Sequence, residues 1–280
     1  MTSAIILTYN EENILDQCLS ALDFVDQIIV FDSFSTDNTL EIAKKHDAKI
    51  IQRVFDNYAA QRNAALESIT TDYNWVLMVD ADEIITEPLK NEIIKATSTE
   101  NTTTMYRVRR KDMFQDKWIK QSSGYPTWFP RLFKNGCVTV EREINEEYNT
   151  TGAEGVLHEH LIHYPFNKGL TWWFDKHNRY SEMEAQKMLH EINDKLVLSD
   201  LFSNDPPVLK RKAQKRLSYK LPFRPFFIFT AFYILKLGFL NGKAGYTFCK
   251  LRYMYETMID IKFKELKRQQ RKALKQATKA

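Results

Sequence analysis

The first 80 residues alternate short β-branched apolar runs with helical patterns, and this alternation restricts the fold more than any other feature. The predicted elements are strands at 4–8, 27–31, 49–52 and 75–79, and helices at 14–22, 39–46 and 58–68. Such alternation is typical of an α/β fold, in which helices cover both faces of a mostly parallel sheet. Ligands of these folds bind at the carboxyl ends of the strands, so we look for a site there.

Polar residues follow three of the predicted strands. They are Thr8-Tyr9-Asn10-Glu11, Asp32-Ser33 and Asp80-Ala81-Asp82-Glu83. Helix capping is an ordinary role for Asn and Asp at such junctions, and it stays open for Asn10 and Asp37. Asp80 and Asp82 differ, because two carboxylates this close repel each other unless a cation lies nearby. Hard oxygen ligands suit Mg²⁺ or Mn²⁺, which complete their shell with phosphates and water.

Taken in order, these motifs resemble glycosyltransferase family 2, the inverting enzymes of GT-A fold. The residues that carry the resemblance are Thr8-Tyr9-Asn10-Glu11-Glu12, Asp32-Ser33-Phe34-Ser35-Thr36-Asp37, Gln61-Arg62-Asn63, Asp80-Ala81-Asp82-Glu83, Arg131-Leu132-Phe133, His158-Glu159 and Asn178-Arg179-Tyr180. Their order is similar to that of the lipopolysaccharide core β-glucosyltransferase branch. Many family members have Asp-Asp-Gly-Ser where this chain has Asp32-Ser33-Phe34-Ser35, so the first Asp is retained and the second is lost.

The resemblance implies a nucleotide-sugar site. The residues that it implies for donor binding are Thr8, Tyr9, Glu11, Asp32, Arg62, Asp80, Ala81 and Asp82. Asp32 would accept a hydrogen bond from the uracil N–H, and Asp82 would hold Mn²⁺ or Mg²⁺ on the diphosphate. That ion and a nearby arginine neutralise the leaving nucleoside diphosphate without a proton donor. Without the resemblance, Arg62 reads equally well as a surface charge on a helix.

An inverting transfer also needs a carboxylate that takes the proton of the acceptor hydroxyl. Residues 155–164 read as a strand in which Glu159 lies on the opposite face from His158 and His160. In the enzymes that the chain resembles, the corresponding His-Glu lies on the acceptor side, so Glu159 is the predicted base. Asp112 and Glu154 stay open as alternatives.

The histidines around Glu159 do not form a zinc-protease motif. That motif needs His-Glu-x-x-His, and Ile162 stands at the fifth position here. Structural hydrogen bonding is the ordinary role of such histidines. His163 is a further candidate for the metal shell beside Asp82.

Aromatic residues between the two halves of the predicted site suggest where an acceptor sugar binds. Trp118, Tyr125 and Trp128 would offer flat surfaces for sugar rings, and Arg179 would reach the site from a helix. Packing in the core is the alternative for these aromatic side chains.

The charge of the chain changes sign near residue 205. From Val208 onward there are 19 Lys and Arg against 3 acids, a formal charge of +16, which leaves −12 for the first 205 residues. Residues 221–240 are rich in Phe, but Arg224 and Lys236 interrupt them. We therefore expect a GT-A domain at 1–205, and at 206–280 a basic, aromatic helical extension on an anionic membrane. A helical pair packed on the body is the alternative.

These features predict an inverting, metal-dependent hexosyltransferase. It would move a sugar, glucose by the branch resembled, from a UDP-sugar to a lipid-linked glycan acceptor of cell-envelope polysaccharide or lipopolysaccharide. From three cysteines without a disulfide pattern and an N-terminus without a signal sequence, we expect it in the cytoplasm, peripheral on the inner membrane face. The alternative is a nucleic-acid or anionic-surface binding protein with a nucleotide-sensing body. The acidic body argues against nucleic acid, and the absence of a Gly-rich loop argues against a nucleotidyltransferase.

Overall fold

The computed structural model describes residues 1–99, 102–141, 147–192, 213 and 215–277 of the chain. They form two compact units, Met1–Lys168 and Gly169–Ala280, each with its own core. The expected domain boundary after residue 205 lies outside the described residues. The helix α5 (Gly169–Glu191), which we expected in the first domain, groups with the C-terminal helices instead.

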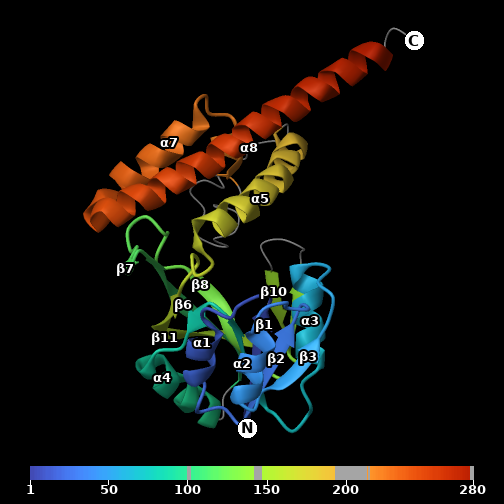
Figure 1. The fold of residues 1–280 in the computed structure, drawn as a ribbon, viewed down its shortest axis with the longest axis vertical. Coiled ribbons are helices and arrows are strands. Elements are labelled where there is room, and N and C mark those ends of the chain that lie inside the picture. Colours follow the sequence, from blue (N-terminus) through green and yellow to red (C-terminus); the bar gives the residue numbers. More distant parts are fainter. Residues whose placement is uncertain (100–101, 142–146, 193–212, 214, 278–280) are drawn as a thin grey trace. The chain divides into compact units, whose positions relative to one another are not determined.

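The first unit is built on a mixed sheet with the order β3-β2-β1-β4-β8-β6-β11-β5, in which β7 pairs with β6 (Figure 1). The strands are β1 (Thr2–Thr8), β2 (Gln27–Asp32), β3 (Lys49–Gln52), β4 (Trp75–Asp80), β5 (Glu83–Ile84), β6 (Thr103–Phe114), β7 (Lys117–Trp118), β8 (Trp128–Lys134) and β11 (Ala153–His163), and a separate pair is formed by β9 (Val138–Glu141) and β10 (Glu147–Thr150). β8 runs antiparallel to both β4 and β6, and β11 runs parallel to β6. The carboxyl ends of β1, β2, β4, β6 and β11 therefore meet at one edge of the sheet.

The helices that accompany this sheet in the described part of the unit are α1 (Leu15–Ser20), α2 (Thr39–Lys45), α3 (Tyr58–Glu67) and α4 (Glu87–Ser98). The strands and helices predicted for the first 80 residues are confirmed, and their ends agree within two residues. The α/β fold class is confirmed with them.

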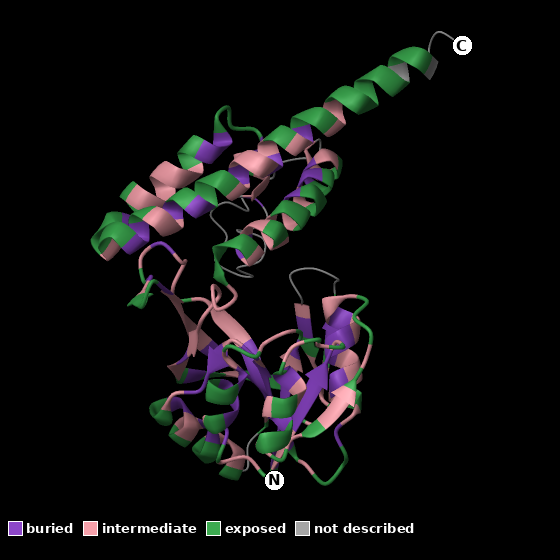
Figure 2. Ribbon diagram, in the orientation of Figure 1, coloured by how far each residue is buried: buried purple, intermediate pink, exposed green. Residues whose placement is uncertain are grey.

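Strand β1 explains why the predicted strands are apolar throughout. Ala4 and Ile6 pack in one core cluster with Leu15 of α1, whereas Ile5 packs in the other cluster with Ala65 of α3. Successive side chains point to opposite faces of a strand, and helices cover both faces here (Figure 2). The strand is therefore apolar on both faces.

Strand β11 departs from the regular strand that the sequence predicts. Its register against β6 passes from Leu157 opposite Val108 to His160 opposite Arg109, so two residues stand between neighbouring pairs. The backbone N–H groups of these two, His158 and Glu159, donate to the Glu92 carboxylate of α4 at 2.7 and 2.8 Å. This bulge breaks the expected alternation around Glu159.

The second unit is helical. Its elements are α5, α7 (Arg224–Thr230), the π-helical turn η2 (Ala231–Leu235), the 3-10 turn η3 (Gly238–Asn241) and α8 (Gly242–Ala277). Ala185 and Met188 of α5 share a small core with Ile259 and Phe263 of α8. The predicted helical C-terminal region is thus confirmed.

Within the described residues, no single helix has the length and apolar composition needed to cross a membrane. The helical segments 224–235 and 238–273, related by a 70° bend, meet that requirement only when taken together. Gly238 follows the bend, and a Cβ there would lie 2.6 Å from the backbone oxygen of Phe232. Only glycine permits this close approach of the two backbone segments.

Candidate active site

Polar side chains from five strands gather at the carboxyl-end edge of the sheet. Thr8, Asp32 and Asp80 are the last residues of β1, β2 and β4. Asp112 near the end of β6 lies opposite His163, the last residue of β11. The sheet therefore brings together predicted site residues that are far apart in the sequence.

Asp32 is fully buried and accepts hydrogen bonds from three segments. Thr8 Oγ1 donates to Oδ1 at 2.9 Å, and Gln52 Nε2 donates to Oδ2 at 3.1 Å. The backbone N–H of Ser35 donates to Oδ2 at 2.9 Å, and the Ser35 hydroxyl donates to Oδ1. About four hydrogen bonds fill the acceptor capacity of a carboxylate. A base that bonds to Asp32 must therefore displace one of these donors.

Asp80 lies between two buried arginines. Arg62 of α3 donates to Oδ1 and Arg131 of β8 donates to Oδ2, both at 2.8 Å. Arg62 is 5% exposed, so the reading of this residue as a surface charge is wrong. Burial acts to raise the pKa of Asp80, but the two guanidinium groups override it and hold that pKa well below its usual range.

Arg131 also binds Glu83, which is fully buried. Its Nε and Nη2 donate to the two Glu83 oxygens at 2.7 and 2.8 Å, and Glu83 Oε2 accepts the backbone N–H of Asp80 at 3.1 Å. Arginine charge therefore offsets Asp80, so the expectation that Asp80 needs a metal to lie near Asp82 is wrong. Ala81 between them packs its methyl group in the core.

Asp82 lies beside His163, which in turn contacts Asp112. His163 Nε2 is 3.3 Å from Asp82 Oδ2, and its Nδ1 is 2.7 Å from Asp112 Oδ1. Arg110 Nε lies 2.9 Å from the same Asp112 oxygen. Burial acts to lower the pKa of His163, but the neighbouring carboxylates, Asp82 foremost, raise it to about 9. The imidazole is thus charged at neutral pH and bridges two carboxylates.

This arrangement also fits a divalent cation. When Nδ1 donates to Asp112, a neutral His163 presents the Nε2 lone pair next to the Asp82 carboxylate. A histidine that binds a metal usually donates its other ring N–H to a carboxylate, as His163 does to Asp112. Within the described ranges no group of three or more His, Cys, Asp or Glu side chains is arranged to hold an ion. Asp82 and His163 therefore suit an ion, such as Mn²⁺ or Mg²⁺, that takes further ligands from phosphates and water.

The loop after β1 is fixed by residues that follow β11. Lys168 Nζ lies 2.6 Å from Glu11 Oε1 and donates to the Tyr9 carbonyl oxygen at 2.7 Å, while Asn167 donates to Glu11 Oε2 at 2.9 Å. Burial raises the pKa of Glu11 against the opposing effect of Lys168. The Tyr9 side chain is 52% exposed, which leaves its ring accessible to a ligand.

Glu159, the predicted base, lies apart from the Asp82 cluster. Its carboxylate is 43% exposed and stands 3.8 Å from His160 Nδ1, and it interacts electrostatically with Lys111. Lys111 and Asp112 are neighbours in β6, so their side chains point to opposite faces of the sheet. The structure therefore groups Glu159 with Lys111 on one face and Asp112 with His163 on the other.

The alternative Glu154 lies near the start of β11, where its carboxylate accepts from Arg107 Nε at 2.8 Å. This position is at the opposite end of the strand from His163. Of the three carboxylates that the sequence offers as a base, Asp112 is the one at the carboxyl-end edge.

The predicted acceptor residues lie in different places. The rings of Trp118 and Tyr125 pack edge to face with centroids 5.0 Å apart, and Lys111 Nζ lies 4.6 Å from the Trp118 ring. Trp128 is on β8, and all three aromatic side chains are half-buried, so neither full burial nor a fully open platform describes them. Arg179 is an exposed residue of α5, in the second unit.

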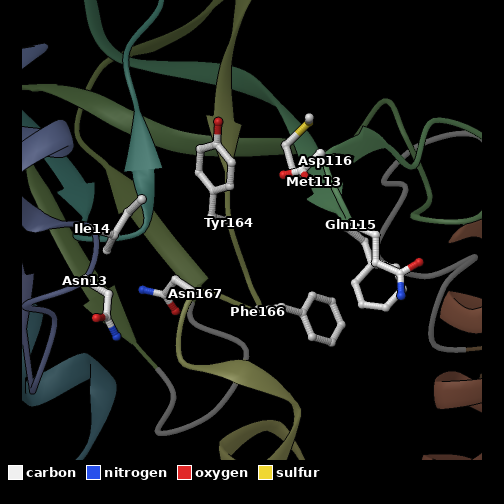
Figure 3. A pocket seen from close by; sticks show the side chains of 9 residues that line it. Asn13, Ile14, Met113, Gln115, Asp116, Tyr164, Phe166 and Asn167 are labelled. Carbon is white, nitrogen blue, oxygen red and sulfur yellow. The ribbon is translucent and has the colours of Figure 1, made fainter.

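A cavity of about 250 Å³ is lined by residues that follow β6 and β11 in the chain. Figure 3 shows its lining side chains. Its lining includes Asn13 before α1, Gln115 after β6, and Tyr164, Phe166 and Asn167 after β11. The backbone N–H of Tyr164 donates to the Asp82 carbonyl oxygen at 2.9 Å, which ties the cavity wall to the site. Aromatic and amide side chains suit a sugar. Because they come from distant segments, this cavity could not be predicted from the sequence.

Comparison with known proteins identifies the class. The chain belongs to glycosyl transferase family 2, whose model matches residues 3–154. An uncharacterized glycosyltransferase of Rickettsia conorii is 34% identical over 202 residues, which cover 68% of this chain and 71% of that protein. The glycosyltransferase SunS of Bacillus subtilis is 34% identical over 148 residues, covering 51% and 33% of the two chains.

The chain is therefore a glycosyltransferase that uses a nucleotide sugar, and the expected GT-A fold and enzymatic activity are confirmed. The alternative of a binding protein without activity is set aside. Among solved structures, Staphylococcus aureus TarS 1-349 gives a TM-score of 0.44 at 16% identity, covering 97% of this chain and 91% of that one. Mycobacterium tuberculosis glucosyl-3-phosphoglycerate synthase with Mn²⁺ and UDP gives 0.35 at 19% identity, covering 44% and 47%. The assignment is carried by the family match and the sequence relatives.

Proposed function

We propose that this glycosyltransferase inverts the anomeric centre and moves a hexose from UDP to a lipid-linked glycan acceptor of cell-envelope polysaccharide or lipopolysaccharide. Glucose is the first candidate for the sugar. The observation that carries the proposal is the cluster of Asp80, Asp82, Asp112 and His163 at the carboxyl-end edge, where parallel α/β sheets bind ligands. The family resemblance of the motifs supports the choice of donor and acceptor.

The nucleotide is assigned to the ends of β1 and β2. Asp32 would accept the uracil N–H in exchange for Gln52, whose 3.1 Å bond is the longest that Asp32 receives. The exposed ring of Tyr9 is suited to stack on the base, and Thr8 and Glu11 shape the same loop. Arg62 acts through Asp80, because its Nη2 donates to that carboxylate.

Asp82 and His163 are the residues that would hold Mn²⁺ or Mg²⁺. An ion held there would supply positive charge to the leaving diphosphate. Asp112 keeps His163 turned so that Nε2 faces Asp82. His163 must release its proton to act as a ligand, because the charged imidazole has no free lone pair.

The acceptor hydroxyl needs a base on the same edge. Asp112 meets this requirement by position, while Glu159 is favoured by the family resemblance. The cavity lined by Tyr164, Phe166 and Asn167 is the proposed acceptor subsite, because it adjoins Asp82 and offers aromatic faces together with an amide.

We further propose that the enzyme works as a peripheral protein at the inner face of the cytoplasmic membrane, where a lipid-linked acceptor is accessible from the cytoplasm. The charge of +16 after Val208 supports an anionic surface as partner, and the charge of −12 before it argues against nucleic acid.

A donor screen tests this function. The purified protein is incubated with Mn²⁺ and a panel of UDP- and GDP-sugars, and retained or hydrolysed nucleotides are identified by mass spectrometry. We expect selective retention or slow hydrolysis of a UDP-hexose. Selection of a GDP-sugar would refute the UDP assignment, and indifference to every nucleotide sugar would refute the proposed site.

A further inference from the structure

The helical hairpin of residues 223–246, formed by α7, η2, η3 and the first turn of α8, exposes large apolar side chains. The exposed fractions are 82% for Phe223, 59% for Phe226, 77% for Leu235 and 60% for Leu240. Contiguous exposure of this kind marks a surface that binds a protein or a membrane.

Exposed apolar residues recur along the first arm of the hairpin. This apolar stripe comprises Phe223, which precedes α7, Phe226 and Phe227 of α7, and Ile234 of the π-helical turn η2. All four are at least 45% exposed. Leu235 at the end of η2 adds a further exposed apolar side chain next to the bend.

The opposite face of α7 is packed on α8. The buried Arg224 forms an ion pair with the fully buried Glu256, and Arg252 Nη2 lies 2.7 Å from the other Glu256 oxygen. Further along the arm, the rings of Tyr233 and Tyr246 lie 5.7 Å apart. A buried ion pair is costly to break, so it fixes which face of α7 points inward. The apolar stripe is therefore held outward by the folded hairpin.

Charge on the hairpin selects the partner. No acidic residue occurs between Asp205 and Glu256, and Glu256 is buried in its ion pairs. Lys236 and Lys243 of the hairpin are exposed, and so is Lys250 further along α8. Lysines that flank apolar residues place their charge among lipid headgroups while their stems stay in the apolar layer.

We propose that residues 223–246 insert into the interfacial layer of an anionic bilayer as an in-plane anchor that does not cross it. The apolar stripe enters the acyl boundary, and the flanking lysines contact anionic headgroups. The lysine at the bend, Lys236, opposes deeper insertion of the tip. This inference deepens the proposed function, on which its purpose of bringing the enzyme to a lipid-linked acceptor rests.

Vesicle sedimentation of the full-length protein tests the anchor. Phosphatidylcholine vesicles with and without phosphatidylglycerol are compared at low and high salt. We expect tight binding to the anionic vesicles, part of which persists at high salt because apolar burial is not screened. Replacing Phe226, Leu235 and Leu240 together by Ser should weaken binding at least about tenfold. The matched control Ile261→Ser removes a 61% exposed side chain of α8 outside the hairpin and should bind like wild type.

Several outcomes overturn the inference. The first is wild-type protein that does not bind anionic vesicles, and the second is a triple variant that sediments with them like wild type. The third is light scattering that finds a dimer for wild type and a monomer for the triple variant, with no difference in vesicle binding. Unchanged helical circular dichroism and an unchanged urea unfolding midpoint show that each variant is folded. Vesicle binding without sugar transfer would refute the proposed function alone, whereas full transfer to a lipid acceptor without vesicle binding would refute the anchor alone.

Discussion

The two units of the chain use charge in opposite ways. At the sheet edge of residues 1–168, Arg131, Asp80 and Glu83 are buried or half-buried and paired with one another. In the second unit, exposed lysines such as Lys236 and Lys243 flank apolar side chains. Paired buried charges fix geometry at the expense of solvation, whereas exposed cations remain available to a partner. The comparison assigns chemistry to the first unit and surface attraction to the second.

The largest expected effect concerns the base at the sheet edge. Asp112→Asn keeps the size of the side chain but cannot accept a proton, so we expect turnover to fall by about 10²- to 10⁴-fold. Glu159→Gln should stay within a few fold of wild type, because Glu159 groups with Lys111 on the other face of the sheet.

Steady-state transfer from the UDP-sugar, with UDP affinity measured in parallel, distinguishes the two carboxylates. A large loss in Glu159→Gln with Asp112→Asn unaffected would show that the resemblance identified the base and that the edge cluster does not.

The site illustrates what the sequence can and cannot predict. Asp80 directly follows the apolar run that predicts strand β4. The position of Asp80 at the sheet edge therefore follows from the local sequence pattern alone. Arg131 is 51 residues from Asp80 and 48 from Glu83, and no local pattern reports that three-residue pairing. The β11 bulge cannot be predicted from the sequence for the same reason, because the Glu92 carboxylate that binds it lies 66 residues from His158.

Breaking the buried pairs should destabilise the first unit. Arg131→Met leaves Glu83 without its closest cation, and removal of one partner from a buried pair costs about 3–5 kcal/mol. The matched control is Arg107→Met, whose pair with Glu154 has side chains 32% and 46% exposed and should cost about 1 kcal/mol or less. Urea unfolding followed by circular dichroism gives both values. Equal losses of unfolding free energy in the two variants would mean that burial does not make the Arg131 ion pairs more important for stability than the exposed pair.

A smaller effect is expected from acid on the second unit. Burial lowers the pKa of His177 to about 4, and the ring stacks on Trp173 with centroids 3.7 Å apart. Between pH 6.5 and 4, His177 is protonated in the unfolded chain but stays neutral in the folded protein. The free energy of unfolding therefore falls as the pH is lowered through this window. Allowing for solvent screening, we expect a loss of about 1 kcal/mol between pH 6.5 and 5.

The control for this prediction is His177→Phe, which keeps an aromatic ring and cannot titrate. The urea unfolding midpoint is measured at pH 6.5 and at pH 5 for both proteins. The difference between these two midpoints should be smaller for His177→Phe than for wild type. An identical pH dependence in both proteins would remove His177 as the source.

The most direct test of the account is nucleotide affinity as a function of metal and of Asp82. UDP binding is measured by calorimetry in Mn²⁺ and in EDTA for wild type and for Asp82→Ala. Because Asp82 and His163 lie 3.3 Å apart and suit an ion bound to the diphosphate, Mn²⁺ should tighten UDP binding to wild type strongly and to the variant hardly at all. UDP affinity that is indifferent to both the ion and the substitution would contradict the assignment of the sheet edge as the transfer site.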